Sequence, residues 1–172
     1  MAIWQFRIDL IPRKAIRRIF GELPISLPEE LAEEFLWWSD AQPPKGFEAW
    51  ITVFLPEAQS WSQTMRIWGD ERGDTGSVCY SNGDQVESVG FRIDVRQLSL
   101  AFVRNICELA VRLDCMLLTG TYHLLAPDDL TVLSSINSST AQRYLNDPVS
   151  TLRELKRQST DAIPFPRKED ER

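Results

Sequence analysis

The sequence is poor in the residues from which metal and catalytic sites are most often built. It has one histidine, His123, and three cysteines, Cys79, Cys107 and Cys115, whose spacings match no zinc-binding pattern. It contains no glycine-rich dinucleotide motif, no P-loop, no HExxH and no CxxC. We therefore expect no metal, no cofactor and no catalytic residue, which argues against an enzyme without excluding one.

Long apolar runs and clustered basic residues are also absent. No stretch of about 18 apolar residues occurs, and the N-terminus lacks the order of basic, apolar and small residues typical of a signal peptide. The formal net charge is −6, with 25 acidic against 19 basic residues, whereas binding to a nucleic-acid backbone needs clustered lysine and arginine. The sequence thus predicts a soluble, cytoplasmic protein that binds neither a membrane nor a nucleic acid.

What is present is typical of a globular domain. Of the 172 residues, 43% are hydrophobic and six are tryptophan, which is enough for one well-buried core. We predict a single α+β domain over residues 1–157, followed by a loose polar tail over residues 158–172.

Alternation, helical spacing and turn residues predict the elements of this domain. Alternation and β-favouring residues indicate strands at 4–10, 48–55, 64–69, 77–81, 86–96 and 115–125, the last one interrupted at Gly120. Capping residues and apolar stripes indicate helices at 15–20, 26–38 and 99–113, and two more that begin at Ser139 and Pro148. The predicted fold class is α+β, with a mostly antiparallel sheet of about five or six strands and helices packed on one face.

The segment 57–69 fits either a helix or a strand, and the hairpin loops around it favour a strand at its end. If Asp70–Gly73 forms a four-residue loop, Met65 pairs with Val78. Met65 would then belong to the apolar face of the sheet, and Trp68 would lie on the opposite, polar face.

The tetrapeptide Phe-Arg-Ile-Asp occurs twice, at residues 6–9 and 91–94. In both strands the alternation points the apolar side chains inward and the arginine and aspartate outward. Six residues are therefore candidates for a binding surface on the polar face: Arg7, Asp9, Trp68, Arg92, Asp94 and Arg96. Tryptophan and arginine are enriched at binding hot spots, but antiparallel sheets also commonly leave one face solvated, so both interpretations stay open.

The other polar candidates have simple structural interpretations. His123 lies in a predicted strand, and Cys107 and Cys115 fall among core positions, where cysteine behaves as a small apolar residue. The acidic segment 29–34 forms either the solvated face of a helix or a face that docks a basic partner.

Several segments resemble known small bacterial proteins. LPEAQSWS (55–62), WGDERGD (68–74), FRIDVRQ (91–97) and SSTAQRYLNDP (138–148) look like uncharacterised small bacterial α+β proteins. They are also similar in style to immunity proteins of bacterial toxin systems, which are acidic, rich in tryptophan and without catalytic motifs. The resemblance implies a cytoplasmic binder whose partner is another protein.

Two functions follow from these observations as expectations. The first is a non-enzymatic protein-binding module, of the kind of an immunity inhibitor of a bacterial toxin. The alternative is a protein or enzyme that binds a small anionic ligand with Arg92, Asp94 and Arg96. The sequence leaves self-association, the identity of any partner and the order of the strands open.

Overall fold

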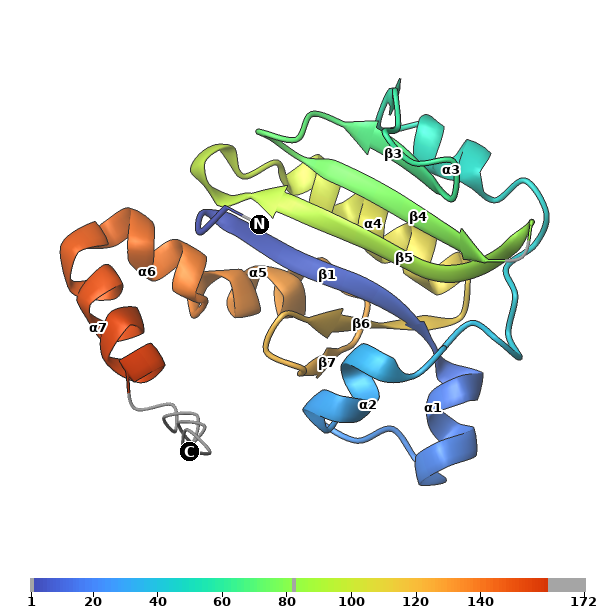
Figure 1. The fold of residues 1–172 in the computed structure, drawn as a ribbon, viewed down its shortest axis with the longest axis horizontal. Helices are drawn as coiled ribbons and strands as arrows, with labels where there is room; N and C mark the ends of the chain where they lie inside the picture. The colour runs from blue at the N-terminus through green and yellow to red at the C-terminus, as the bar shows by residue number, and fades with distance from the viewer. Residues whose placement is uncertain (1, 82, 161–172) are drawn as a thin grey trace, which may run out of the picture.

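The computed structural model describes residues 2–81 and 83–160 and places their strands in one sheet (Figure 1). The sheet has seven strands in the order β2-β3-β4-β5-β1-β6-β7, and every neighbouring pair is antiparallel. The strands are β1 (Gln5–Pro12), β2 (Glu57–Ala58), β3 (Met65–Gly69), β4 (Thr75–Ser81), β5 (Gln85–Asp94), β6 (Cys115–Thr119) and β7 (Leu124–Leu125). The predicted α+β class is confirmed. The number of strands is slightly higher than predicted because β2 and β7, at the two edges, have two residues each.

The helices lie mainly on one side of this sheet. They are α1 (Arg13–Phe20), α2 (Glu29–Glu34), α3 (Glu48–Thr52), the 3₁₀ turn η1 (Val95–Gln97), α4 (Leu100–Arg112), α5 (Asp129–Asn137), α6 (Thr140–Asn146) and α7 (Pro148–Thr160). Figure 1 shows α4 crossing behind the sheet. α1 and α2 lie next to each other at the end of β1, and α2 borders a cavity together with β1 and β6. None of the helices described here is long and apolar enough to cross a membrane.

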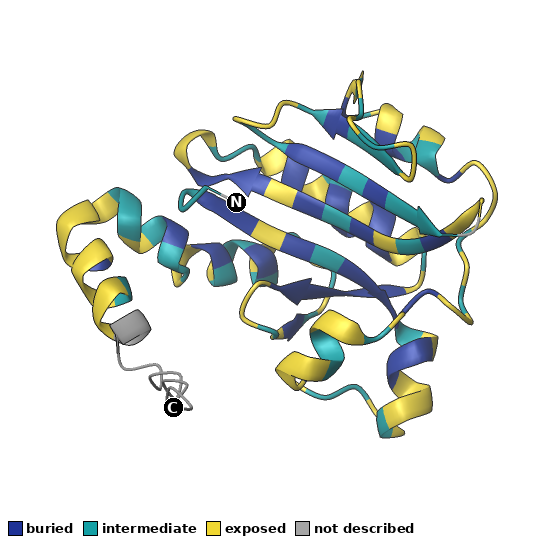
Figure 2. Cartoon of the chain, in the orientation of Figure 1, coloured by how far each residue is buried: buried dark blue, intermediate teal, exposed yellow. Residues whose placement is uncertain are grey.

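The main core lies between α4 and the back of the sheet. Phe91 of β5 and Phe102 of α4 meet edge to face with their ring centroids 6.1 Å apart, and Phe54 lies 6.0 Å from Phe102. Such aromatic pairs contribute beyond the area that they bury. Alternate residues of β1 and β5 supply the rest of this surface, as the burial pattern in Figure 2 shows.

Three predicted helix ends are confirmed. The Ser99 hydroxyl accepts a hydrogen bond from the Phe102 amide at the start of α4, and the Ser139 hydroxyl accepts one from the Gln142 amide at the start of α6, each at 3.2 Å. Gly21 ends α1 in the left-handed conformation, with φ 77°, which glycine adopts without a Cβ penalty.

The prediction of a strand at 48–55 is wrong, because Glu48–Thr52 form helix α3 and residues 53–55 form a turn. Phe47, Ile51 and Leu55 are all buried and recur every four residues, which is helical spacing. The β-favouring residues of this segment suggested a strand, but β propensity depends strongly on context. These three buried side chains pack on one side of the segment, and their packing favours a helix over a strand.

The helix predicted at 26–38 is shorter than expected. It ends at Glu34, and no side chain caps its first turn, so the predicted capping box at Ser26 is absent. Ser26 instead forms an isolated bridge with His123. The predicted strand at 115–125 is also two strands, because the interruption at Gly120 reverses the chain into the β6–β7 hairpin.

The hairpin between β3 and β4 has a five-residue loop, Asp70–Asp74, instead of the four-residue loop that the sequence suggested. Gly69 therefore pairs with Thr75. A shift of one residue turns every side chain of a strand to the other face. The predicted position of Trp68 on the polar face is thus wrong. Its side chain is fully buried on the α4 side, and its indole Nε1 donates to the Thr52 hydroxyl at 3.0 Å.

Contacts from β1 and β5 explain the length of this loop. The Gln5 side-chain amide donates to the carbonyl oxygens of Glu71 and Gly73, at 3.1 and 3.2 Å. The Asp94 amide donates to the Asp74 carboxylate at 2.8 Å. These partners are far apart in the sequence, so rules for local turns do not include them.

The C-terminal helix α7 runs slightly past its predicted end. It continues to Thr160, whereas the sequence predicted an end near Arg157. Most of the predicted loose tail, residues 161–172, lies outside the described residues, so that part stays a prediction.

Candidate functional site

The two copies of Phe-Arg-Ile-Asp lie side by side in the sheet. The antiparallel register of β1 and β5 pairs Phe6 with Ile93, Arg7 with Arg92, and Ile8 with Phe91. The apolar residues of both copies are buried, and both arginines are exposed on the opposite face, as predicted. The repeat thus forms a nearly symmetrical pair of strands centred on two arginines.

The side of the sheet that carries these arginines has no helix over its central strands (Figures 1 and 2). We call this surface the open face and define it by Arg7, Ser77, Ser88, Gly90 and Arg92. Its residues other than the arginines have small side chains or none. The two long cationic side chains are therefore surrounded by small serine side chains and, over Gly90, by the Asp9 carboxylate.

Positive charge on the open face is only partly neutralised. Arg7 Nε lies 2.7 Å from the Asp9 carboxylate, whereas the Arg92 guanidinium has no hydrogen bond or ion pair with any described residue. Like charges directly opposite each other in neighbouring strands are unfavourable. Asp9 acts electrostatically on both guanidinium groups and relieves part of this repulsion, which leaves Arg92 as the arginine of the pair without an ion pair in the described chain.

Asp9 lies directly over a glycine in the neighbouring strand. A Cβ built on Gly90 would stand 2.7 Å from Asp9 Oδ1, so only glycine leaves room for the carboxylate there. The Asp9 side chain is 17% exposed. Burial raises the pKa of Asp9, and the positive charges of Arg7 and Arg92 oppose this shift without cancelling it. A buried carboxyl group with a perturbed pKa is typical of functional sites.

Asp94, the equivalent residue of the second copy, is also buried, but its pKa shifts in the opposite direction. Arg96 binds both of its carboxylate oxygens, with Nε 2.9 Å from Oδ1 and Nη2 2.7 Å from Oδ2. These hydrogen bonds lower the pKa of Asp94. The strand ends at Asp94, so Arg96 belongs to the turn η1, where its guanidinium stacks 4.5 Å from the Trp4 ring centroid. The predicted outward row of Arg92, Asp94 and Arg96 is therefore broken after Arg92.

We expect the two aspartates to change stability with pH in opposite directions. The pKa of Asp9 is raised above 3.8, so the folded state holds this proton more tightly, and stability falls as the pH rises through the folded pKa. The pKa of Asp94 is lowered, so its contribution is complete above 3.8 and is lost as the pH falls through the folded pKa.

Urea unfolding of Asp9→Asn and Asp94→Asn from acidic to neutral pH measures both effects. In the wild type, each aspartate makes the free energy of unfolding depend on pH, with a slope that corresponds to at most about one proton taken up or released on unfolding. Each variant should lose the slope of its own aspartate, and the two lost slopes should have opposite signs. Two difference curves with the same sign would contradict the assigned environments.

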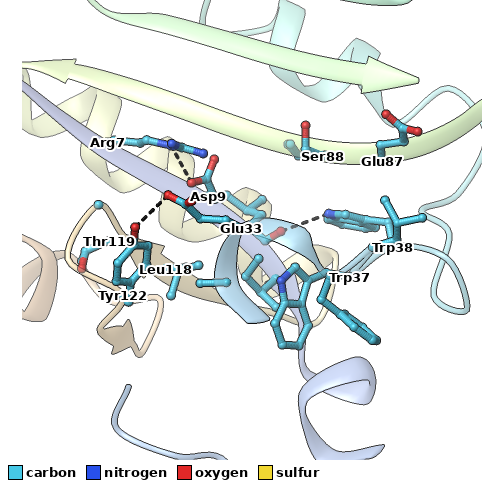
Figure 3. A pocket seen from close by; sticks show the side chains of 17 residues that line it. Arg7, Asp9, Glu33, Trp37, Trp38, Glu87, Ser88, Leu118, Thr119 and Tyr122 are labelled. Carbon is cyan, nitrogen blue, oxygen red and sulfur yellow. Dashed lines mark hydrogen bonds and ion pairs between the residues drawn. The ribbon is translucent and has the colours of Figure 1, made fainter. Parts of the chain in front are cut away.

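A cavity of about 500 Å³ lies beside Asp9, between the sheet and α2 (Figure 3). Arg7 and Asp9 of β1 and Glu87 of β5 lie on the sheet side, and Glu33 of α2 lies on the helix side. A volume of this size is within the usual range for ligand-binding pockets. Because Arg7 also belongs to the open face, the cavity and the open face are continuous.

Tyr122 forms part of one wall of the cavity, and its backbone has an uncommon conformation. Its φ is 63°, a region that non-glycine residues seldom adopt. In this conformation its hydroxyl donates to Glu33 at 2.8 Å and lies 3.2 Å from a carboxylate oxygen of Glu29. The hydrogen bond to Glu33, with these negative charges, raises the pKa of Tyr122 to about 12. The phenol therefore stays protonated and holds α2 against the β6–β7 turn.

Two adjacent tryptophans line the same cavity and differ in their hydrogen bonds. The indole Nε1 of Trp38 donates to the Leu10 carbonyl oxygen at 3.1 Å. Trp37 is 4% exposed, and its Nε1 is buried without a hydrogen-bond partner in the described structure. A buried donor without a partner costs free energy of the order of 1–3 kcal/mol.

The structure brings together only part of the predicted binding set. Arg7, Asp9 and Arg92 cluster on one surface, whereas Trp68 is in the core and Arg96 is paired with Asp94. Sequence reasoning missed Glu33, Glu87, Trp37 and Tyr122 as members of the site. No local signal marks them, because α2 and the β6–β7 turn approach the open face only in the tertiary structure.

The histidine and the core cysteines have no part in this site. His123 Nδ1 lies 3.2 Å from the Thr121 hydroxyl, beside a different cavity of about 580 Å³. Burial raises the pKa of the Cys107 thiol to about 12 and also raises that of Cys115, so neither forms the reactive thiolate at neutral pH. Both cysteines are buried, as the sequence predicted. In the described ranges, no three His, Cys, Asp or Glu side chains are placed to bind one metal ion.

Comparison with protein-family models, curated proteins and solved structures finds no match to this chain. The resemblance to immunity proteins therefore stays a prediction.

Proposed function

We propose that this chain is a non-enzymatic, cytoplasmic protein-binding module, of the kind of an immunity inhibitor that neutralises a bacterial toxin. The observation that carries the proposal is the pair Arg7–Arg92, exposed and directly opposed on the open face, where no described helix covers the central strands. The resemblance of the sequence to immunity proteins supports the same reading.

The open face has the chemistry of a protein-binding surface. Arginine is enriched at binding hot spots, and a guanidinium binds a carboxylate through two parallel hydrogen bonds. The small residues Ser77 and Ser88 let the main chain of a partner approach the sheet closely. An acidic segment of the partner would relieve the repulsion between Arg7 and Arg92.

Charge of both signs surrounds this surface. The helix α2, which borders the cavity, carries Glu29, Glu30, Glu33 and Glu34. Positive and negative patches placed side by side fix the register of a complex and accelerate its formation. A partner with the matching pattern, acidic opposite the arginines and basic opposite α2, is therefore favoured.

Binding of a small ligand is the second candidate function, and the cavity is the observation that favours it. The sequence suggested a ligand site made of Arg92, Asp94 and Arg96, but none of these residues lines the cavity. Asp94 and Arg96 also neutralise each other. A small-molecule site would instead use Arg7 and Asp9.

We expect Arg92→Glu to weaken binding to the protein partner at least about tenfold, because a new negative charge meets the acidic segment. Co-expression with the products of adjacent genes, followed by calorimetric titration of any complex obtained, measures this change. Arg17→Glu is the matched control, since Arg17 is an exposed residue of α1 that belongs neither to the open face nor to the lining of the cavity, and the net charge changes equally.

Two results would count against the proposed surface. One is equal affinity of Arg92→Glu and the wild type. The other is an equal loss of affinity in Arg92→Glu and Arg17→Glu, which would indicate an effect of net charge alone.

A further inference from the structure

The cavity beside the open face has an excess of negative charge. Among its lining residues are three carboxylates, Asp9, Glu33 and Glu87, and one guanidinium, that of Arg7. Arg7 is paired with Asp9. Neither Glu33 nor Glu87 forms an ion pair with a basic side chain of the described residues. The two unpaired carboxylates leave the cavity suited to a cation.

The arrangement fits an extended cationic group better than a bare metal ion. A metal ion needs several ligands that converge on one point, and the described residues form no such group here. Figure 3 shows Glu33 and Glu87 on different sides of the cavity, one from α2 and one from β5. A guanidinium or ammonium group on a long side chain presents several donors and can reach separate acceptors.

The aromatic walls of the cavity support the same ligand. Phe35, Trp37, Trp38 and Tyr122 line it, and Phe35 and Trp37 meet edge to face with their centroids 4.8 Å apart. Aromatic rings attract cations, and they cover the apolar stems of lysine and arginine side chains.

Trp37 contributes its ring to the cavity wall, and not a hydrogen bond to a ligand. Its Nε1 is buried, with almost no surface that a bound group could contact. A ligand in the cavity is therefore held by the carboxylates and the aromatic rings, and a lysine or arginine side chain has the charge and the apolar stem to match both.

We propose that the cavity between the sheet and α2 binds a lysine or arginine side chain of the protein partner, while Arg7 and Arg92 bind an acidic segment of the same partner. This inference rests on the proposed function and specifies its chemistry. Because Arg7 belongs to both surfaces, the two partner residues would lie close together on one face of the partner.

The first test uses small probes and needs no partner. Nα-acetyl-arginine methylamide and the corresponding lysine amide are titrated into the ¹⁵N-labelled protein, with the neutral norleucine amide as the control probe. The indole N–H signals of the six tryptophans are followed, and Trp37→Phe assigns the signal of Trp37. We expect millimolar binding of both basic amides that shifts the Trp37 signal, and no shift with norleucine amide.

Variants of α2 and β5 test the role of the carboxylates. Glu33→Gln keeps an acceptor for the Tyr122 hydroxyl but removes the charge, and Glu87→Gln removes the charge on the sheet side. Each should weaken binding of the basic amides about threefold to fivefold, as expected for a partly exposed charge pair. Glu30→Gln is the matched control, because Glu30 is an exposed residue of the same helix that does not line the cavity.

The outcomes separate this inference from the proposed function. If the basic amides do not shift Trp37, or if norleucine amide shifts it equally, the cavity does not bind a basic side chain, even where Arg92→Glu abolishes the partner complex. If the amides bind as expected but Arg92→Glu leaves the complex unchanged, the open face is wrong and the cavity assignment stands.

Discussion

Replacement of Trp68 by alanine should lower the free energy of unfolding by about 3–5 kcal/mol, the cost of removing a large buried aromatic side chain. Trp68 is fully buried, and its indole Nε1 donates to the Thr52 hydroxyl. The Arg66 guanidinium also stacks 5.0 Å from its ring centroid. The variant removes apolar contacts, one hydrogen bond and one cation–π contact together. Urea unfolding at neutral pH measures the change.

Trp61→Ala provides the matched control for this prediction. Trp61 lies in the loop between β2 and β3 and is 81% exposed, so its replacement should change stability by less than about 0.5 kcal/mol. A loss of less than about 1 kcal/mol for Trp68→Ala would indicate an exposed side chain and a four-residue loop, as the sequence alone suggested.

The second large effect is expected at the start of the same hairpin. Gly69 has a φ of 82°, and a Cβ at this position would stand 2.2 Å from the Asp74 carbonyl oxygen. Because that atom belongs to the backbone, the clash cannot be relieved by rotating a side chain. We expect Gly69→Ala to lower the free energy of unfolding by about 3 kcal/mol, since backbone strain of about 1–3 kcal/mol is added to the displacement of the loop.

Gly21→Ala separates the two causes. Gly21 also has a positive φ, 77°, but no atom lies within 4 Å of the position that its Cβ would take. This variant should therefore lose only the cost of the left-handed conformation, about 1–2 kcal/mol. Equal losses for the two variants in urea unfolding would show that the clash with the Asp74 carbonyl oxygen adds nothing to the cost of the positive φ.

The open face could be predicted only in part. Alternation correctly turned Arg7 and Arg92 outward, because each lies in a strand with one buried face. Their direct opposition could not be inferred, since it requires that the first and fifth strands be neighbours. The same tertiary pairing places Asp9 over Gly90 and so separates the environments of two aspartates that have identical local sequences.

Local chemistry determined the elements whose signals are strong. Capping by Ser99 and Ser139 fixed the starts of α4 and α6, and Gly21 fixed the end of α1, because a side-chain acceptor or a missing Cβ acts within a few residues. Long alternating strands such as β1 and β5 were equally clear, since one face of each is buried.

Only the tertiary structure decided the features that depend on distant partners. Gln5 and Asp94 hold the β3–β4 loop at five residues, which turns Trp68 into the core. Packing against the sheet makes a helix of a segment rich in β-favouring residues. The approach of α2 and Tyr122 to β1 creates the cavity. Each of these depends on contacts between residues far apart in the chain, whose free energy a local pattern does not contain.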